Sequence, residues 1–245
     1  MKVIGDSDRA RLAVIGSQHG NEPFGRDVIL RLAEDFKEVS DLLLVVANEE
    51  ALAQNVRFID EDLNRAYGKP PGSSHEASVA HRITQTIENV PLVLDLHTTQ
   101  ADVREFPIIV RYRTEEQCLI SATDYRDVAY MDLPHGGDNS GLGSISGGGL
   151  ALEFSHSYTT NSFDQAYRDV YTIIERVLSG VARQPRPRRI FHVTHVAPWI
   201  APEELALNDF RYSPELGGYA VLPNASEYVG KHRGFVATEV IDVEL

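Results

Sequence analysis

Short apolar runs alternate with amphipathic segments along most of the sequence, and this alternation is the strongest constraint on the fold. Residues 12–16 and 42–47 are short, apolar and rich in branched side chains, as in strands that are buried on both faces. Residues 22–39 place their apolar side chains along one face of a helix. Strands that alternate with helices are typical of a parallel sheet covered by helices. We therefore expect an α/β fold with a mixed, mostly parallel sheet flanked by helices.

The same pattern continues through the middle of the chain. Further strands are expected at residues 92–96, 106–110 and 150–154, and further helices at residues 74–89 and 162–178. Ser73 or Ser74 can cap the first of these helices, because a serine hydroxyl accepts a hydrogen bond from the first turn. The glycine-rich run at 141–149 is expected to be a flexible connection. All these elements belong to the first predicted domain, residues 1–185.

The last part of the chain has a different pattern. Residues 184–189, QPRPRR, carry two prolines and several charged side chains, which suits a linker. From residue 190 onward, short strand-like runs are broken by Pro, Gly and Asn, with a weak helical pattern at 202–207. We therefore predict a small, mostly β domain at residues 190–245 after the α/β domain.

Composition and charge narrow the class of protein. The net charge is −13, and no cluster of basic residues marks a surface for nucleic acid. No stretch approaches the roughly 18 apolar residues of a membrane helix, and the N-terminal residues lack the apolar centre of a signal peptide. Cys118 is the single cysteine, so any metal must be held by histidine and carboxylate. We expect a cytoplasmic protein that binds neither nucleic acid nor a membrane, and a homo-oligomer is compatible with the sequence.

Two histidines and a glutamate follow predicted strands. His19 and Glu22 come directly after the strand at 12–16, and His97 ends the strand at 92–96. Ligands of open α/β sheets collect at the carboxyl ends of strands, so neighbouring strands would bring these side chains together. Two imidazoles and one carboxylate suit a catalytic zinc ion with a fourth position for water. On these residues alone, ordinary surface histidines explain the pattern about equally well.

A further polar cluster and the order of all the motifs favour the metal site. Residues 57–65 read RFIDEDLNR, although a solvated charged loop would look similar on its own. The motifs HGNE, RFIDEDLNR, LDLHTT and LEF stand in the order and approximate spacing of the succinylglutamate desuccinylase and aspartoacylase family. This family is a branch of the zinc carboxypeptidase superfamily. Residues 12–155 resemble it through these motifs, and the C-terminal β-rich part is similar to its second domain.

The resemblance implies a role for each conspicuous side chain of these motifs. By this resemblance, the ligands of one zinc ion per chain are His19, Glu22 and His97, and the acid and base is Glu153. The group that polarises the scissile carbonyl is Arg57, and the groups that bind a substrate carboxylate are Asn64 and Arg65. The resemblance also implies a tyrosine that reaches the active site, Tyr228. Glu153 ends an apolar run, so its carboxylate should be partly desolvated and held on a rigid strand.

Three neighbouring positions refine this picture. Asp62 is expected to orient an arginine or a ligand histidine. Asp95, two residues before His97, projects to the same face of the strand, where it is either an outer partner of a ligand or a buried structural carboxylate. Aspartoacylase has a substrate-binding arginine at the position of Gly143, so N-acetylaspartate is not the expected substrate.

We therefore expect a zinc-dependent hydrolase, a deacylase that cleaves the amide bond of an N-acyl amino acid or a similar small substrate with a carboxylate. A metallocarboxypeptidase acting on short peptides would use the same groups. A metal-binding or ligand-binding protein without activity on the same scaffold is an alternative of another class. An esterase or amidase that uses Ser155 would work without metal.

Overall fold

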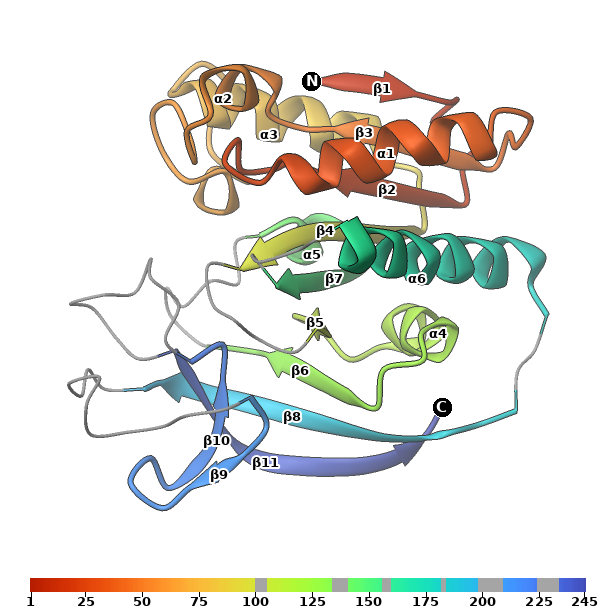
Figure 1. Cartoon of the computed structure of the whole chain (residues 1–245). Coiled ribbons are helices and arrows are strands. Elements are labelled where there is room, and N and C mark those ends of the chain that lie inside the picture. The colour runs from red at the N-terminus through yellow and green to blue at the C-terminus, as the bar shows by residue number, and fades with distance from the viewer. Residues whose placement is uncertain (100–104, 134–140, 156–159, 182–183, 198–208, 224–233) are drawn as a thin grey trace.

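One mixed sheet runs through the molecule (Figure 1). The computed structural model describes residues 1–99, 105–133, 141–155, 160–181, 184–197, 209–223 and 234–245. In these ranges eleven strands pair in the order β1, β3, β2, β4, β7, β5, β6, β8, β11, β10, β9. The strands are β1 (Lys2–Ile4), β2 (Leu12–Gly16), β3 (Leu42–Val46), β4 (Leu92–Thr99), β5 (Phe106–Ile109), β6 (Asp127–Met131), β7 (Gly148–Ser155), β8 (Pro187–Val196), β9 (Tyr212–Ser213), β10 (Gly218–Val221) and β11 (Phe235–Glu244).

Strand directions in the first part of the chain follow the expected mixed, mostly parallel pattern. β3, β2, β4 and β7 are parallel to one another, whereas β1 is antiparallel to β3 and β5 is antiparallel to β7. β6 is parallel to both β5 and β8, and β8 pairs with β11 in an antiparallel ladder. The C-terminal region is mostly β, as expected, and it extends the same sheet through the β6–β8 pairing. The division into domains 1–185 and 190–245 stays a prediction.

Helices pack on both faces of the sheet. They are α1 (Pro23–Asp35), α2 (Glu49–Gln54), the 3₁₀ turn η1 (Leu63–Arg65), α3 (His75–Thr86), α4 (Thr114–Ala122), α5 (Leu142–Ile145) and α6 (Thr160–Ser179). One core joins α1, α4 and α6 to one face, with Val28, Leu119 and Ile174 fully buried. A second core joins α3 and η1 to the other face of β2, β3 and β4, around Ile83 and Leu63.

A third apolar cluster lies on the strands that follow β4 and β7 in the strand order of the sheet. It covers β5, β6, β8 and β11 and includes Phe106, Met131, Phe191 and Phe235. Because side chains alternate along a strand and paired residues share a face, the pairing of Asp95 with Ala151 and of Ala151 with Ile108 places these clusters on one face. That face therefore carries both apolar clusters, and the buried polar residues Asp95 and His97 lie on it towards the carboxyl end of β4.

Local differences from the expected elements have simple causes. Ser74 caps α3, as predicted, and its hydroxyl accepts a hydrogen bond from the amide of Ala77 at 2.9 Å. The run at 141–149 holds a helical turn and the start of β7, because Gly148 and Gly149 allow close packing against neighbouring groups. The predicted helix at 202–207 lies outside the described residues. Within the described ranges, no helix combines the length and apolar character needed to cross a bilayer.

Candidate active site

A tight turn after β2 presents two of the predicted metal ligands. Ser17 adopts a left-handed backbone with φ 55°, and its hydroxyl donates to the carbonyl of Glu22 at 2.9 Å and accepts from the amide of Arg26. A Cβ atom on Gly16 would lie 2.8 Å from Cα of Gly25, so glycine is required where the strand end contacts the first turn of α1. This packing fixes the short segment that carries His19 and Glu22.

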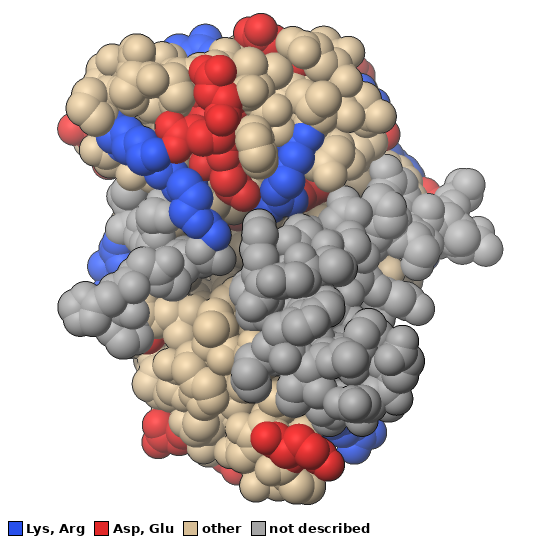
Figure 2. Space-filling model, turned by 90° about the vertical axis from the view of Figure 1, so that its left-hand side faces the viewer, with Lys and Arg blue, Asp and Glu red and all other residues tan. Residues whose placement is uncertain are grey.

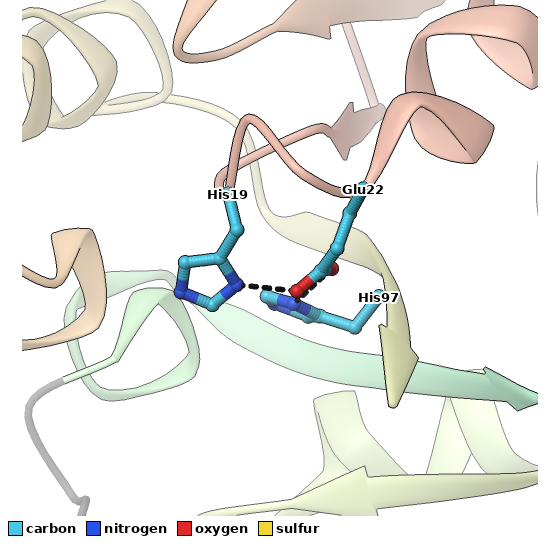
Figure 3. Close-up of side chains that lie close together, drawn as sticks. All are labelled: His19, Glu22 and His97. Carbon is cyan, nitrogen blue, oxygen red and sulfur yellow. Dashed lines mark hydrogen bonds and ion pairs between the residues drawn. The ribbon is translucent and has the colours of Figure 1, made fainter. Parts of the chain in front are cut away.

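His19, Glu22 and His97 lie together at the carboxyl ends of the neighbouring strands β2 and β4 (Figure 3). One nitrogen or oxygen atom from each lies within 4.8 Å of the others, and all three side chains are buried. Nδ1 of His19 lies 2.7 Å from Oε1 of Glu22, and Nδ1 of His97 lies 3.3 Å from Oε2 of Glu22. The expected convergence is therefore observed, whereas the role of the three residues as zinc ligands stays a prediction.

The protonation of this cluster reflects the carboxylate between the two rings. Burial alone would raise the pKa of Glu22, but the imidazoles of His19 and His97 hold it well below its usual range. Burial lowers the pKa of His97, but Asp95 and Glu22 outweigh burial and raise it. The protonated forms of the two imidazoles and the ionised form of the carboxylate thus stabilise one another. Two imidazoles around one buried carboxylate fit a divalent cation, which would displace these protons on binding.

A chain of hydrogen bonds orients the His97 ring from the side that faces away from Glu22. Nε2 of His97 lies 2.9 Å from Oδ2 of Asp95, so Nδ1 of the ring faces Glu22. The side-chain amide of Gln18 donates to the same carboxylate oxygen, and the Tyr67 hydroxyl donates to the Gln18 carbonyl oxygen at 2.6 Å. Asp95 is thus the outer partner of a candidate ligand, one of its two expected roles. Outer partners of this kind fix the ring orientation and the tautomer of a ligating histidine.

Asp62 orients both the other histidine and an arginine. Its Oδ1 lies 3.1 Å from Nε2 of His19, and its Oδ2 accepts from Nη2 of Arg57 at 3.1 Å. Asp62 therefore contacts an arginine and a candidate ligand histidine, the two partners that were expected as alternatives. Arg57 also lies 3.5 Å from Glu22 through Nη1, so its guanidinium is held at the edge of the candidate metal site.

The loop that carries Arg57 and Asp62 is held by a buried carboxylate in the first turn of α3. Glu76 accepts hydrogen bonds from the backbone amides of residues 59, 60 and 61 at 2.7, 3.0 and 3.2 Å, and from the Asn48 side chain at 3.0 Å. Burial would raise the pKa of Glu76, but these donors outweigh it and lower the pKa. Glu76 therefore shapes the loop without reaching the cavity.

Sequence reasoning missed Glu76, Gln18 and Tyr67. For Glu76 a signal was present: positions 76, 80, 83 and 87 repeat at helical spacing, and the other three are apolar. A charged side chain on the buried face of a helix needs partners. No comparable signal marks Gln18 or Tyr67, because their contacts depend on the tertiary fold.

The candidate metal site opens into a cavity of about 720 Å³. All the predicted site residues except Tyr228 line it. Glu153 on β7 lies opposite His97 in the β4–β7 register, and Asn64 and Arg65 belong to η1. Tyr228 lies outside the described residues. Ser155 lines a separate pocket with Glu105 and Tyr125. The catalytic and substrate-binding roles of these residues stay predictions.

The sequence matches a known family model. The model of the succinylglutamate desuccinylase/aspartoacylase catalytic domain matches residues 8–148. A probable aspartoacylase from Nostoc sp. is 31% identical over 108 residues, and one from Acaryochloris marina is 29% identical over 110 residues. Each alignment covers 38% of this chain and 36% of the relative, so it spans about a third of either protein.

Solved structures show the fold over almost the whole chain. The structure of murine aminoacylase 3 has a TM-score of 0.79 at 21% identity, covering 96% of this chain and 97% of that one. Succinylglutamate desuccinylase from Chromobacterium violaceum has a TM-score of 0.67 at 18% identity, covering 98% of this chain and 87% of that one. These likenesses establish the α/β architecture, including the C-terminal β region.

Proposed function

Since this chain belongs to the succinylglutamate desuccinylase/aspartoacylase family, we propose that it is a zinc-dependent deacylase. Its proposed substrate is an N-acyl amino acid or a similar small molecule with a carboxylate. The observation that carries the proposal is the buried group of His19, Glu22 and His97, which opens into a cavity shared with Glu153. A zinc ion bound there would acidify a water molecule and polarise a carbonyl group.

The residues around this site would divide the remaining work of amide hydrolysis. The Glu153 carboxylate would accept a proton from the attacking water and deliver it to the nitrogen of the leaving amine. Arg57, held by Asp62, would stabilise the negative charge that develops on the carbonyl oxygen. Asn64 and Arg65 would bind the substrate carboxylate, for which the planar guanidinium offers two parallel donors.

Replacing Glu153 with glutamine tests the proposal. We expect Glu153→Gln to keep about one zinc per chain, because the three ligands are unchanged, and to lose most turnover of N-acyl amino acids. Zinc is measured by elemental analysis and turnover by release of the free amine. Ser155→Ala is the matched control, and it should keep both zinc and turnover, because Ser155 lines a separate pocket.

Alternative functions predict other outcomes in the same assays. A metallocarboxypeptidase would cleave short peptides in preference to N-acyl amino acids. A non-catalytic binding protein would bind zinc and cleave neither. An esterase or amidase that uses Ser155 would survive chelation of the metal and would be inactivated by Ser155→Ala.

We also propose a cytoplasmic location, which is supported by one cysteine in 245 residues. A single cysteine cannot form a disulfide bond within the chain, and proteins without such bonds are usual in a reducing compartment. Fractionation of cells that express the tagged protein checks this proposal.

A further inference from the structure

The cavity at the candidate active site has two different walls. Towards β2 and β4 its lining is polar and includes His19, His97 and both arginines of segment 57–65. Its other wall is apolar. That wall, called here the apolar wall, consists of Ile108, Val110, Met131, Leu133, Ala151, Val196, Leu222 and Phe235.

Strand pairing places the apolar wall directly beside the proposed acid and base. Ala151 precedes Glu153 by two residues on β7, so both side chains point to the same face of the sheet. Ala151 pairs with Ile108 on β5, and Ile108 pairs with Ala129 on β6. The wall therefore starts next to Glu153 and continues away from the zinc ligands towards β8 and β11.

The apolar wall is the cavity-facing edge of a packed cluster. Ile108, Met131, Leu133, Leu222 and Phe235 are each at most 8% exposed and belong to the third apolar cluster. Their positions are fixed by packing against Phe191, Val193 and Phe210. A rigid apolar surface favours an apolar group placed against it, because that group leaves water.

Charge is distributed unevenly over the same cavity. Among the described lining residues the cations are Arg57 and Arg65, both on the polar side. Figure 2 shows charged side chains gathered in the upper part of this end of the molecule, uncharged surface across its middle where described residues are seen, and further charged side chains at its lower edge. A carboxylate placed against the apolar wall would lose its hydration without gaining a described cationic partner, which is costly.

We propose that the substrate carries one carboxylate, bound on the polar side, and an apolar group that lies against the apolar wall. This inference rests on the proposed deacylase function. The apolar group is either the side chain of the amino acid or the acyl chain, because both extend from the scissile amide. Dicarboxylic substrates such as N-acetylaspartate are disfavoured for the same reason.

The test compares matched substrates on the full-length zinc-loaded protein. One arm contains N-acetylleucine and N-acetylphenylalanine, a second contains N-hexanoylglycine, and a third contains N-acetylaspartate and N-acetylglutamate. Both hydrolysis and binding by calorimetry are measured. We expect at least one of the first two arms to exceed the third by about tenfold or more in kcat/KM and in affinity.

A substitution in the apolar wall links this preference to the structure. Leu222 has φ 48°, a backbone conformation in which asparagine is favoured, so Leu222→Asn changes polarity without backbone strain. We expect this variant to lose about tenfold in kcat/KM for the preferred apolar substrate relative to N-acetylaspartate. Leu216→Asn is the matched control: Leu216 is similarly buried, belongs to another cluster, and should keep the parent preference.

The outcomes separate this inference from the proposed function. Faster hydrolysis and tighter binding of the dicarboxylic arm would overturn the inference while the deacylase function stands. Preferential binding of apolar substrates without any hydrolysis would support the inference and overturn the function. If no arm is bound or hydrolysed, both fail. An equal loss for all substrates in Leu222→Asn would also contradict the role of the apolar wall.

Discussion

The sheet face that carries the candidate active site has two halves, which are held together by different kinds of interaction. At the carboxyl ends of β2 and β4, buried charged groups meet in a network in which His19, Glu22, His97 and their outer partners contact one another. Over β5, β6, β8 and β11, the same face is a close-packed apolar cluster. The interactions of the polar half depend on how individual groups are oriented, whereas those of the apolar half depend on how side-chain volumes and shapes fit together. We therefore expect single substitutions in the first half to change metal binding, and those in the second half to change stability and substrate preference.

Removal of a proposed ligand should have the largest effect on metal binding by the polar half. We expect His97→Ala to lower bound zinc from about one per chain to near zero, because a catalytic site supplies three protein ligands at most. Elemental analysis after gel filtration measures this change. His192→Ala on β8 is the control; it should keep zinc, since its ring stacks on Tyr130 outside the cluster. Retention of zinc by His97→Ala would exclude His97 as a ligand.

Loss of an outer partner should have a smaller effect on the same half. Asp95→Asn leaves the three proposed ligands in place but weakens the acceptor for Nε2 of His97. We expect zinc affinity to fall by about 10- to 100-fold, measured by competition with a chelator. Asp127→Asn, which removes a carboxylate paired with Arg189 on the other half, should leave affinity unchanged. If Asp95→Asn and the parent bound zinc with equal affinity, Asp95 would be a structural carboxylate only.

Glu76 should affect the metal site indirectly, because it holds the loop that carries Asp62. Glu76→Gln would turn an amide donor towards backbone amides at 59–61, so we expect about tenfold weaker zinc binding through Asp62 and His19. We also expect a loss of roughly 1 to 3 kcal/mol in unfolding free energy. Glu116→Gln is matched, since Glu116 is equally buried in the first turn of α4 and accepts from backbone amides.

In that control, stability should fall while zinc affinity stays at the parent value. If both variants lost stability and neither lost zinc affinity, Glu76 would have a purely structural role.

The smallest effect on the metal site is expected in the apolar half. Val193→Ala removes two methyl groups' worth of packing from a fully buried position in the third cluster. We expect the free energy of unfolding to fall by roughly 1 to 3 kcal/mol with zinc content unchanged. Denaturant unfolding and elemental analysis together check this. Loss of zinc in this variant would show that the two halves are coupled.

The elements that the sequence predicted well are those with strong periodicity. The buried strands at 12–16 and 42–47 and the helix at 162–178 lie within a few residues of β2, β3 and α6, because hydrophobic patterning alone defines them. The convergence of His19, Glu22 and His97 followed from strand ends and the adjacency of β2 and β4. Local pattern and simple topology were sufficient for both.

Contacts made by the tertiary fold could not be predicted in this way. The contacts of Gln18 and Tyr67 join residues 49 positions apart, and nothing in either local sequence signals them. The helical turn at 142–145 contradicts the expected flexible connection, because packing at Gly148 and Gly149 overrides a weak local preference. The continuity of β8 with β6 likewise depends on pairing between distant segments.

X-ray absorption at the zinc edge of the purified, zinc-loaded protein tests the central claim most directly. The account predicts one zinc per chain with two imidazole nitrogens and carboxylate or water oxygens at about 2.0 to 2.2 Å. A spectrum dominated by a sulfur shell near about 2.3 Å, or the absence of stoichiometric zinc, would contradict it.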